Sequence, residues 1–264
     1  MLKVWKIATL AAVVVLSVNL AQAETINLAT GNSGSAGASI GGTFQAIWVD
    51  QQSTGTGVID SFVRIQAQEN EEGYNTSAGT PMDTLGGNFT HSLQLSAVPI
   101  VTVGGTQYRE FLLDVNQTGA DPLISLNQVQ IFLSAAQAPA NLTSAGTNPP
   151  ILTFAGATEI FRMSGVGAVD EIILDASRNS GSGSGDMLLY VPNSNFTGAA
   201  TQFVTLYSQF GTPPGANDSN AGFEEWAVRE GVAPPPVPEP TSLILLGLGF
   251  VGVGAIARAR ARRR

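Results

Sequence analysis

Acidic residues are the side chains in this sequence best suited to chemistry, and three pairs of them are adjacent. Two carboxyl groups that flank a glycosidic bond are the usual catalytic residues of glycoside hydrolases. In a strand, however, neighbouring side chains point to opposite faces of the sheet, so adjacency alone does not create such a pair. We therefore expect no catalytic pair at these positions, which are Glu71 and Glu72, Asp170 and Glu171, and Glu224 and Glu225.

Nucleophilic and zinc chemistry have still less support. His91 is the only histidine, the chain has no cysteine, and no G-x-S-x-G motif is present. A serine-histidine-aspartate triad would have to use His91, and the common zinc sites need several histidines or cysteines. Because His91 lies in an alternating segment, we expect a partly exposed histidine in a strand. The sequence thus predicts no catalytic residue, no metal ligand, no cofactor and no enzyme.

Calcium is the alternative use for the acidic residues. It prefers carboxylate, amide and main-chain oxygens, which are plentiful in residues 69–75 and 217–225. Neither loop contains a D-x-D-x-D-G run, so this argument rests on composition. We expect solvated acidic loops, with calcium binding as the alternative.

Aromatic side chains could also stack against sugar rings. Most large aromatic residues in a β-sandwich belong to the core, and we place Trp48 there. The other candidates for a sugar-binding surface are Tyr74, Tyr108, Tyr190, Tyr207 and Trp226.

The elements that would position these residues are strands, because alternating or β-branched segments recur between glycine-rich turns. Strands are predicted at residues 25–29, 43–49, 58–66, 89–95, 98–103, 107–115, 126–133, 159–163, 171–175, 187–191, 202–209 and 223–228. No clean helical period interrupts them. The pattern predicts an all-β fold, an antiparallel β-sandwich in jelly-roll or Greek-key style.

Turns and loops separate these strands. Gly104 and Gly105 predict a tight type I′ hairpin, because glycine readily adopts positive φ. Residues 31–37 and 69–73 are predicted to be loops, and residues 135–150 form the longest stretch without a pattern. We expect one domain over residues 24–231 with a long loop, and the alternative is two subdomains divided there.

The first 23 residues are typical of a secretory signal peptide. Lys3 and Lys6 precede an apolar segment, and Ala21 and Ala23 form an A-x-A cleavage site, so the mature chain is predicted to begin at Glu24. The interval from Glu24 to Glu239 holds all 20 acidic residues and five arginines, a formal charge of −15. Nucleic acid is therefore excluded as a partner. The absence of cysteine means that no disulfide holds the exported part.

The other end of the sequence has three parts in order. Residues 232–240 are a proline-rich spacer, residues 241–257 an uncharged apolar segment, and residues 258–264 an arginine-rich tail. At about 1.5 Å per residue the apolar helix would reach roughly 25 Å, close to a membrane core. The arginines place the tail in the cytoplasm and the preceding domain outside. We expect a single transmembrane helix.

These three parts resemble a PEP-CTERM sorting signal, found in Gram-negative bacteria that make extracellular polysaccharide. The resemblance implies that a membrane protease-transpeptidase, exosortase, recognises and removes the tail. It assigns the recognition elements to Pro238, Glu239, Pro240, Arg258, Arg260, Arg262, Arg263 and Arg264.

Three functions are compatible with the sequence. The first is a non-enzymatic envelope or matrix protein, anchored transiently in the inner membrane and then sorted, in association with exopolysaccharide. The second is a carbohydrate- or calcium-dependent binding or adhesion module. The third is a glycoside hydrolase, for which the sequence offers only the adjacent carboxyl pairs.

Overall fold

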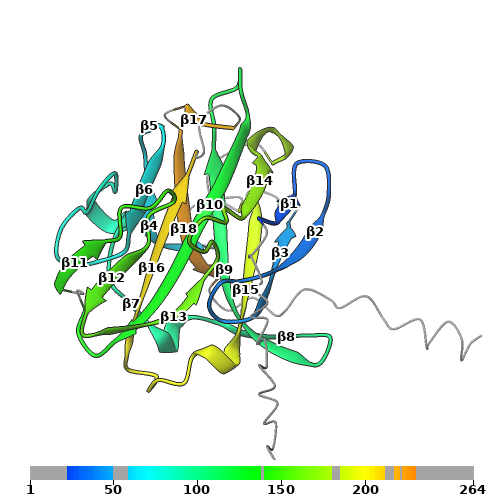
Figure 1. The fold of residues 1–264 in the computed structure, drawn as a ribbon. Helices are drawn as coiled ribbons and strands as arrows, with labels where there is room; N and C mark the ends of the chain where they lie inside the picture. Colours follow the sequence, from blue (N-terminus) through cyan, green and yellow to red (C-terminus); the bar gives the residue numbers. More distant parts are fainter. Residues whose placement is uncertain are drawn as a thin grey trace, which may run out of the picture.

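The structure is a computed structural model that describes residues 23–49, 59–137, 140–179, 185–211, 217–220 and 222–229. These residues form two seven-stranded β-sheets that pack face to face, and two short two-stranded pairs (Figure 1). The strands are mostly antiparallel, and the described residues contain no α-helix. The expectation of an all-β fold is confirmed.

The first sheet has the order β1-β14-β10-β16-β6, with β13 paired to β10 and β7 to β16. Its strands are β1 (Thr25–Asn27), β6 (Glu71–Tyr74), β7 (Leu93–Gln94), β10 (Leu123–Ser134), β13 (Ala157–Arg162), β14 (Glu171–Asp175) and β16 (Phe203–Phe210). The prediction of antiparallel pairing is wrong at one place, because β1 runs parallel to β14.

The second sheet has the order β2-β3-β15-β9-β18-β4, with β8 paired to β9. Its strands are β2 (Ser33–Gly37), β3 (Thr43–Trp48), β4 (Ile59–Ile65), β8 (Ile100–Val103), β9 (Thr106–Asn116), β15 (Met187–Pro192) and β18 (Phe223–Arg229). Among the strands β9, β10, β15, β16 and β18, successive members alternate between the sheets, since β9, β15 and β18 belong to the second and β10 and β16 to the first.

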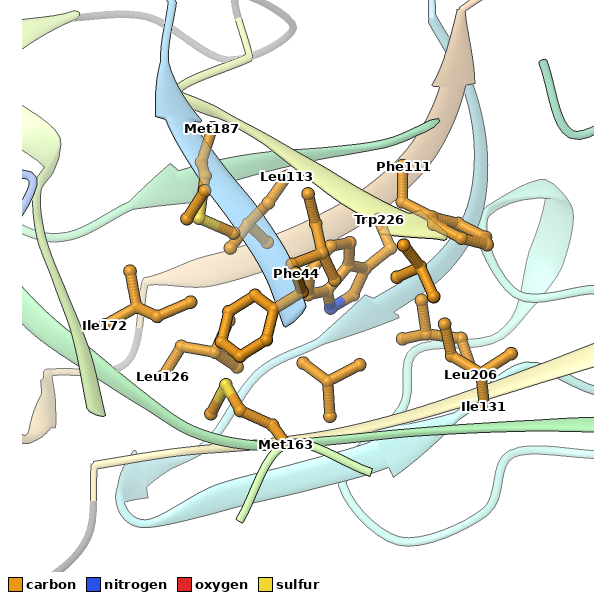
Figure 2. Packing of buried hydrophobic residues seen from close by; sticks show 14 of the residues in the cluster. Phe44, Phe111, Leu113, Leu126, Ile131, Met163, Ile172, Met187, Leu206 and Trp226 are labelled. Atoms are coloured by element: carbon orange, nitrogen blue, oxygen red, sulfur yellow. The ribbon is translucent and has the colours of Figure 1, made fainter. Parts of the chain in front are cut away.

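The core lies between the two sheets. Alternation along each strand turns one set of apolar side chains inward, and those of both sheets form a single buried cluster. Figure 2 shows part of this cluster, with Phe44 and Trp226 of the second sheet near Leu126 of the first. The indole nitrogen of Trp226 donates a buried hydrogen bond of 2.9 Å to the hydroxyl of Ser208, which joins the two sheets directly.

The outer face of the first sheet is also covered. A hairpin of β11 (Ala140–Ser144) and β12 (Leu152–Ala155) places Leu152 and Phe154 against Phe132 and Tyr207. The side chain of Gln130 completes this cover by bonding the main chain of Leu152 in both directions, at 2.9 and 3.2 Å. Residues 135–150, predicted to be an unpatterned loop, therefore contribute a strand to the cover of the sheet.

Two other predicted loops contain strands. Within residues 31–37, β2 pairs with β3 at the sheet edge, and the missing side chain of Gly34 leaves room for Ile26 of β1. Within residues 69–73, Glu71 and Glu72 lie in β6, and Gln68 and Glu69 form β5. Composition concealed both strands, because small and acidic residues are uncommon in sheets.

The strand predicted at residues 89–95 is mostly wrong. Only β7 is extended, between the 3₁₀ turns η1 (Gly87–Phe89) and η2 (Leu95–Ala97). Phe89 does not join the core but is 41% exposed, and its ring stacks against the guanidinium of Arg64 at 3.4 Å. Phe89 is thus held by cation–π stacking on Arg64 of β4, and not by the burial in a strand that the alternating pattern predicts.

β4 is irregular at Phe62. Trp226 pairs with Val63 and Ala227 with Ser61, so β4 carries one extra residue there, a β-bulge that allows Phe62 and Val63 both to be buried. The predicted hairpin is confirmed: Gly104 and Gly105 join β8 to β9 with φ of 58° and 85°.

The predicted signal peptide cleavage residue Ala21, the spacer, the apolar segment and the arginine tail lie outside the described residues. No helix in the described part of the chain has the length and apolar character needed to span a membrane.

Candidate functional site

The two acidic loops for which calcium binding was the alternative, residues 69–75 and 217–225, meet at one end of the sandwich, and we call this region the acidic junction. β5 (Gln68–Glu69) pairs with β17 (Ser219–Asn220), which brings β6 of the first sheet next to β18 of the second. At two places around the acidic junction the backbones approach each other closely. A Cβ at Gly211 would lie 1.9 Å from the carbonyl oxygen of Glu69, and one at Gly222 would lie 1.5 Å from that of Asn116.

Two buried glutamates face each other at this acidic junction. Glu71 projects from β6 and Glu224 from β18, both with no exposed surface. Glu71 Oε2 accepts the main-chain N–H of Ala67 at 2.8 Å, and Glu224 Oε1 accepts the side-chain N–H of Gln117 at 2.5 Å. The remaining oxygens, Glu71 Oε1 and Glu224 Oε2, are buried without an N–H or hydroxyl in full hydrogen-bonding geometry, and the two carboxyl groups interact with each other.

A hydrogen bond between two carboxyl groups requires that one of them is protonated, and burial favours the protonated form. Burial raises the pKa of Glu224 well above its usual value, and the neighbouring carboxyl of Glu71 raises it further. Burial likewise raises the pKa of Glu71, although the bonds from Glu224, Ala67 and Ser219 oppose the change. The pair is therefore a proton-sharing dyad that joins the two sheets.

A polar network holds the dyad in place. The main-chain N–H of Asn220 donates to Gln117 at 2.9 Å, and the Asn220 amide bonds the main chain of Thr118 and of Asp121 at 3.2 and 2.7 Å. The Ser219 hydroxyl donates to the carbonyl of Ala67 at 3.1 Å. β17 therefore fixes both Gln117 and the turn before β6.

The described side chains of the acidic junction do not form a group of metal ligands. Within the described residues no three carboxylate, histidine or cysteine side chains come together where they could hold an ion. The dyad also differs from a glycosidase pair, because its carboxyl groups are in direct contact, whereas those enzymes separate theirs by about 5 Å or more. Residues 212–216 and 221 lie outside the described part of the loop.

The adjacent carboxyl groups of each predicted pair point apart, as expected. Glu225 accepts from the guanidinium of Arg64 at 2.7 Å and from the hydroxyl of Ser61 at 2.8 Å, on the side opposite to Glu224. Arg64 is in turn stacked between the rings of Phe89 and Phe223.

The other two pairs diverge in the same way. Glu72 accepts the hydroxyl of Tyr207 at 2.5 Å, away from Glu71. Asp170 accepts the main-chain N–H of Glu24 at 2.9 Å, whereas Glu171 interacts with Ser125, which lowers the pKa of Glu171 against the effect of burial.

A second buried carboxyl pair lies within the second sheet and was not predicted. Asp186 precedes β15 and its Oδ2 accepts the main-chain N–H of Val115 at 2.7 Å, while its carboxyl group is hydrogen-bonded to that of Asp114. Burial, with a contribution from Asp114, raises the pKa of Asp186 to about 8, although the Val115 bond opposes this.

His91 lies in the irregular segment between η1 and β7 and not in a strand. Its two ring nitrogens lie 3.1 and 3.0 Å from the carbonyl oxygens of Ser92 and Ser61, and the side chain is half-buried. The ring therefore ties the segment before β7 to β4.

The aromatic residues considered for sugar stacking do not form a surface platform. Trp48 belongs to the core, as predicted, and its ring lies 4.3 Å from the guanidinium carbon of Arg178. Tyr74 is half-buried, and the remaining four are buried: Tyr108, Tyr190, Tyr207 and Trp226.

Sequence reasoning identified the loops of the acidic junction but not its pairing. Glu71 and Glu224 were each assigned to an adjacent pair, and the relevant partner is contributed by the other sheet. Composition gives no signal for such a contact, because it depends on which strands become neighbours. Gln117 and Ser219 were missed for the same reason.

Comparison with known families concerns the segment beyond β18. Residues 236–264 match the family model described as the PEP-CTERM protein-sorting motif. The chain has no significant match among curated proteins or solved structures. The match covers the proline-glutamate-proline sequence, the apolar segment and the arginine cluster, the three parts that suggested the resemblance. The chain therefore carries a PEP-CTERM protein-sorting motif at residues 236–264.

Proposed function

We propose that this protein is a non-enzymatic component of the cell envelope or extracellular matrix, delivered through its PEP-CTERM signal and associated with exopolysaccharide. The family match at residues 236–264 is the observation that carries the proposal. The chain is exported with its β-sandwich outside and residues 241–257 in the inner membrane as a transient anchor. Exosortase then removes the tail.

The charge distribution supports this route. Apart from five arginines, the positive charge of the chain lies in the two segments that the proposal removes. The processed protein is an acidic β-sandwich, which electrostatic repulsion keeps dispersed in a crowded matrix. A non-enzymatic role is supported by the divergent carboxyl pairs and by the main-chain contacts of His91.

The sorting step is tested by replacing its recognition elements. The full-length chain is expressed in an exosortase-bearing host, and its C-terminus is identified by mass spectrometry in inner-membrane and matrix fractions. We expect the wild-type protein in the matrix without Arg264, and the variant Pro238→Ala, Glu239→Ala, Pro240→Ala in the inner membrane with Arg264 retained.

The matched control is Pro234→Ala with Pro235→Ala, in the same spacer but outside the motif. It should be sorted like the wild type. A matrix-located wild-type protein that still carried Arg264, or normal processing of the triple variant, would contradict the proposal.

A calcium-dependent adhesion module is the second candidate, favoured by the meeting of the two acidic loops at β5 and β17. Retention of the full-length protein on purified exopolysaccharide, with and without a chelator, separates the two. Retention that is lost in chelator and in the variant Glu69→Gln, Asp218→Asn, at carboxylates with exposed surface, would support adhesion through the acidic junction. Unchanged behaviour in all four conditions would count against it.

A further inference from the structure

Glu24, the residue after the predicted cleavage site, is held tightly where the chain enters the fold. Its main-chain N–H donates to Asp170 Oδ1 at 2.9 Å, and its carbonyl accepts the N–H of Glu171 at 2.9 Å. Its own carboxylate accepts the N–H of Gly37 at 3.1 Å. These bonds reach β2 of the second sheet and the start of β14, which lies beside β1 (Figure 1).

Asp170 has little else to compensate its charge. It is only 5% exposed, and within the described part of the chain no arginine forms an ion pair with it. Burial raises the pKa of Asp170, the N–H of Glu24 opposes this, and the negative charge of Glu24 adds to it. The other nearby carboxyl, that of Glu171, interacts with Ser125. A neutral amide is thus the main donor to a buried acid.

We infer that cleavage after Ala23 converts this amide into an α-ammonium group that forms an ion pair with Asp170, and so fastens β1 to the first sheet more strongly in the processed protein than in the precursor. The inference rests on the export part of the proposed function. Signal peptidase hydrolyses the Ala23–Glu24 bond with one water: the hydroxyl joins the Ala23 carbonyl carbon and a hydrogen joins the Glu24 nitrogen. The proton released by the new carboxyl group then charges the new amine.

The chemistry of the two groups favours this pairing. An α-amino group has an ordinary pKa near 8, so it is mostly protonated at neutral pH. An opposite charge about 3 Å away raises the pKa of the amine and lowers that of the acid. A hydrogen bond between charged partners is roughly twice as strong as a neutral one. The position of the nitrogen does not have to change, because it already donates to Asp170.

The composition of the chain allows a direct test. Lys3 and Lys6 are the only lysines and precede the cleavage site, so the α-amino group is the only primary amine of the processed protein. The exported full-length chain is purified in detergent, its N-terminus is sequenced, and its acylation by the N-hydroxysuccinimide ester of acetic acid is followed against pH. We expect an N-terminus at Glu24.

An ion-paired amine reacts slowly because the reagent requires the neutral form. Acylation at pH 7 should be about tenfold faster in Asp170→Asn than in the wild type, the ratio for a change of one pKa unit. Asp121→Asn, at an exposed carboxylate, should match the wild type. The wild-type chain unfolded in urea gives the rate of the unpaired amine, so the comparison does not depend on the variant's folding.

Acetylation also converts the α-ammonium group back into a neutral amide, the group that Glu24 has in the uncleaved precursor. It should lower the Tm of the wild type by a few degrees and leave that of Asp170→Asn nearly unchanged. An N-terminus other than Glu24, equal acylation rates in folded and unfolded protein, or equal Tm changes in both proteins would overturn the inference. These readouts concern the N-terminus, whereas the sorting experiment reads the C-terminus, so the two can fail separately.

Discussion

Glu224 and Glu225 are neighbours in β18, yet one is buried against a second carboxyl group and the other against the guanidinium of Arg64. The difference follows from the alternation of the strand, which turns Glu224 toward Glu71 and Gln117 and Glu225 toward Arg64. A buried carboxyl without a cation keeps its proton, whereas one beside a guanidinium gives it up. Residue type alone therefore does not determine function at these positions.

The same substitution should have opposite effects at the two glutamates. Glu224→Gln keeps the shape of a protonated acid, since its amide donates to Glu71 and its carbonyl accepts from Gln117. The raised pKa means that Glu224 ionises more readily in the unfolded chain than in the folded protein, so it destabilises the folded state at high pH. Glutamine does not ionise, and we therefore expect Glu224→Gln to be more stable than the wild type at pH 8 and similar at pH 4. Urea denaturation at both pH values measures this.

Glu225→Gln serves as the matched neighbour. It removes the charge that faces Arg64 and should lower the free energy of unfolding by about 1–2 kcal/mol at pH 8. A loss of stability in Glu224→Gln at pH 8 comparable to that in Glu225→Gln would show that Glu224 is ionised and would contradict the proton-sharing dyad.

At the scale of elements, alternation predicted the strands that build the core, and it failed where a strand lies at an edge or carries unusual residues. β9, β10, β15 and β16 were each found within a few residues of their bounds, because apolar side chains at period two repeat along them. β2 and β6 were missed because the residues that suit them do so through contacts with other strands. Gly34 leaves room for Ile26 of β1, and Glu71 is buried facing Glu224 of β18.

The acidic junction depends on a close approach of two backbones that only glycine permits. Gly222→Ala would place a Cβ 1.5 Å from the carbonyl oxygen of Asn116, beside the pairing of Asn116 with Phe223. β9 and β18 would have to separate there, and we expect a loss of about 3 kcal/mol in the free energy of unfolding, at the upper end of overpacking effects. Thermal and urea denaturation of the full-length protein measure it.

The control for this prediction is Gly119→Ala, at an exposed turn where an added Cβ meets nothing within 4 Å. It should change stability by less than about 0.5 kcal/mol. Similar losses in both variants would mean that general loss of glycine, and not the approach of β18 to β9, is responsible.

At the scale of the whole molecule, the raised carboxyl pKa values all lower the free energy of unfolding as pH rises. In the unfolded chain these acids ionise near pH 4, whereas in the folded protein Asp186, Glu71 and Glu224 keep their protons to higher pH. The folded state therefore binds more protons than the unfolded state, and the free energy of unfolding must fall as pH rises. For Asp186 the fall extends from about pH 4 to about pH 8, because its pKa is raised from 3.8 to about 8.

We predict that the Tm is higher at pH 5 than at pH 8 and that Asp186→Asn removes a large part of the difference. One pKa unit corresponds to about 1.4 kcal/mol, so the titration of Asp186 alone is worth on the order of 5 kcal/mol across this range. The asparagine can still accept the N–H of Val115 and donate to Asp114, so it preserves the buried pair without its charge. Thermal denaturation between pH 4 and 9 measures the effect.

General charge repulsion in this acidic chain also weakens the folded state as pH rises, and salt distinguishes the two causes. Repulsion among exposed carboxylates is screened within about 10 Å at 0.1 M salt and more strongly at 1 M, whereas a buried pair is screened much less. The pH dependence that remains at 1 M salt should therefore be the part that Asp186→Asn removes, and Asp121→Asn, at an exposed site, should leave it intact. If high salt abolished the pH dependence in the wild type, repulsion among exposed carboxylates would account for all of it. The buried acids would then ionise over the same pH range as the exposed ones, and the prediction would be wrong.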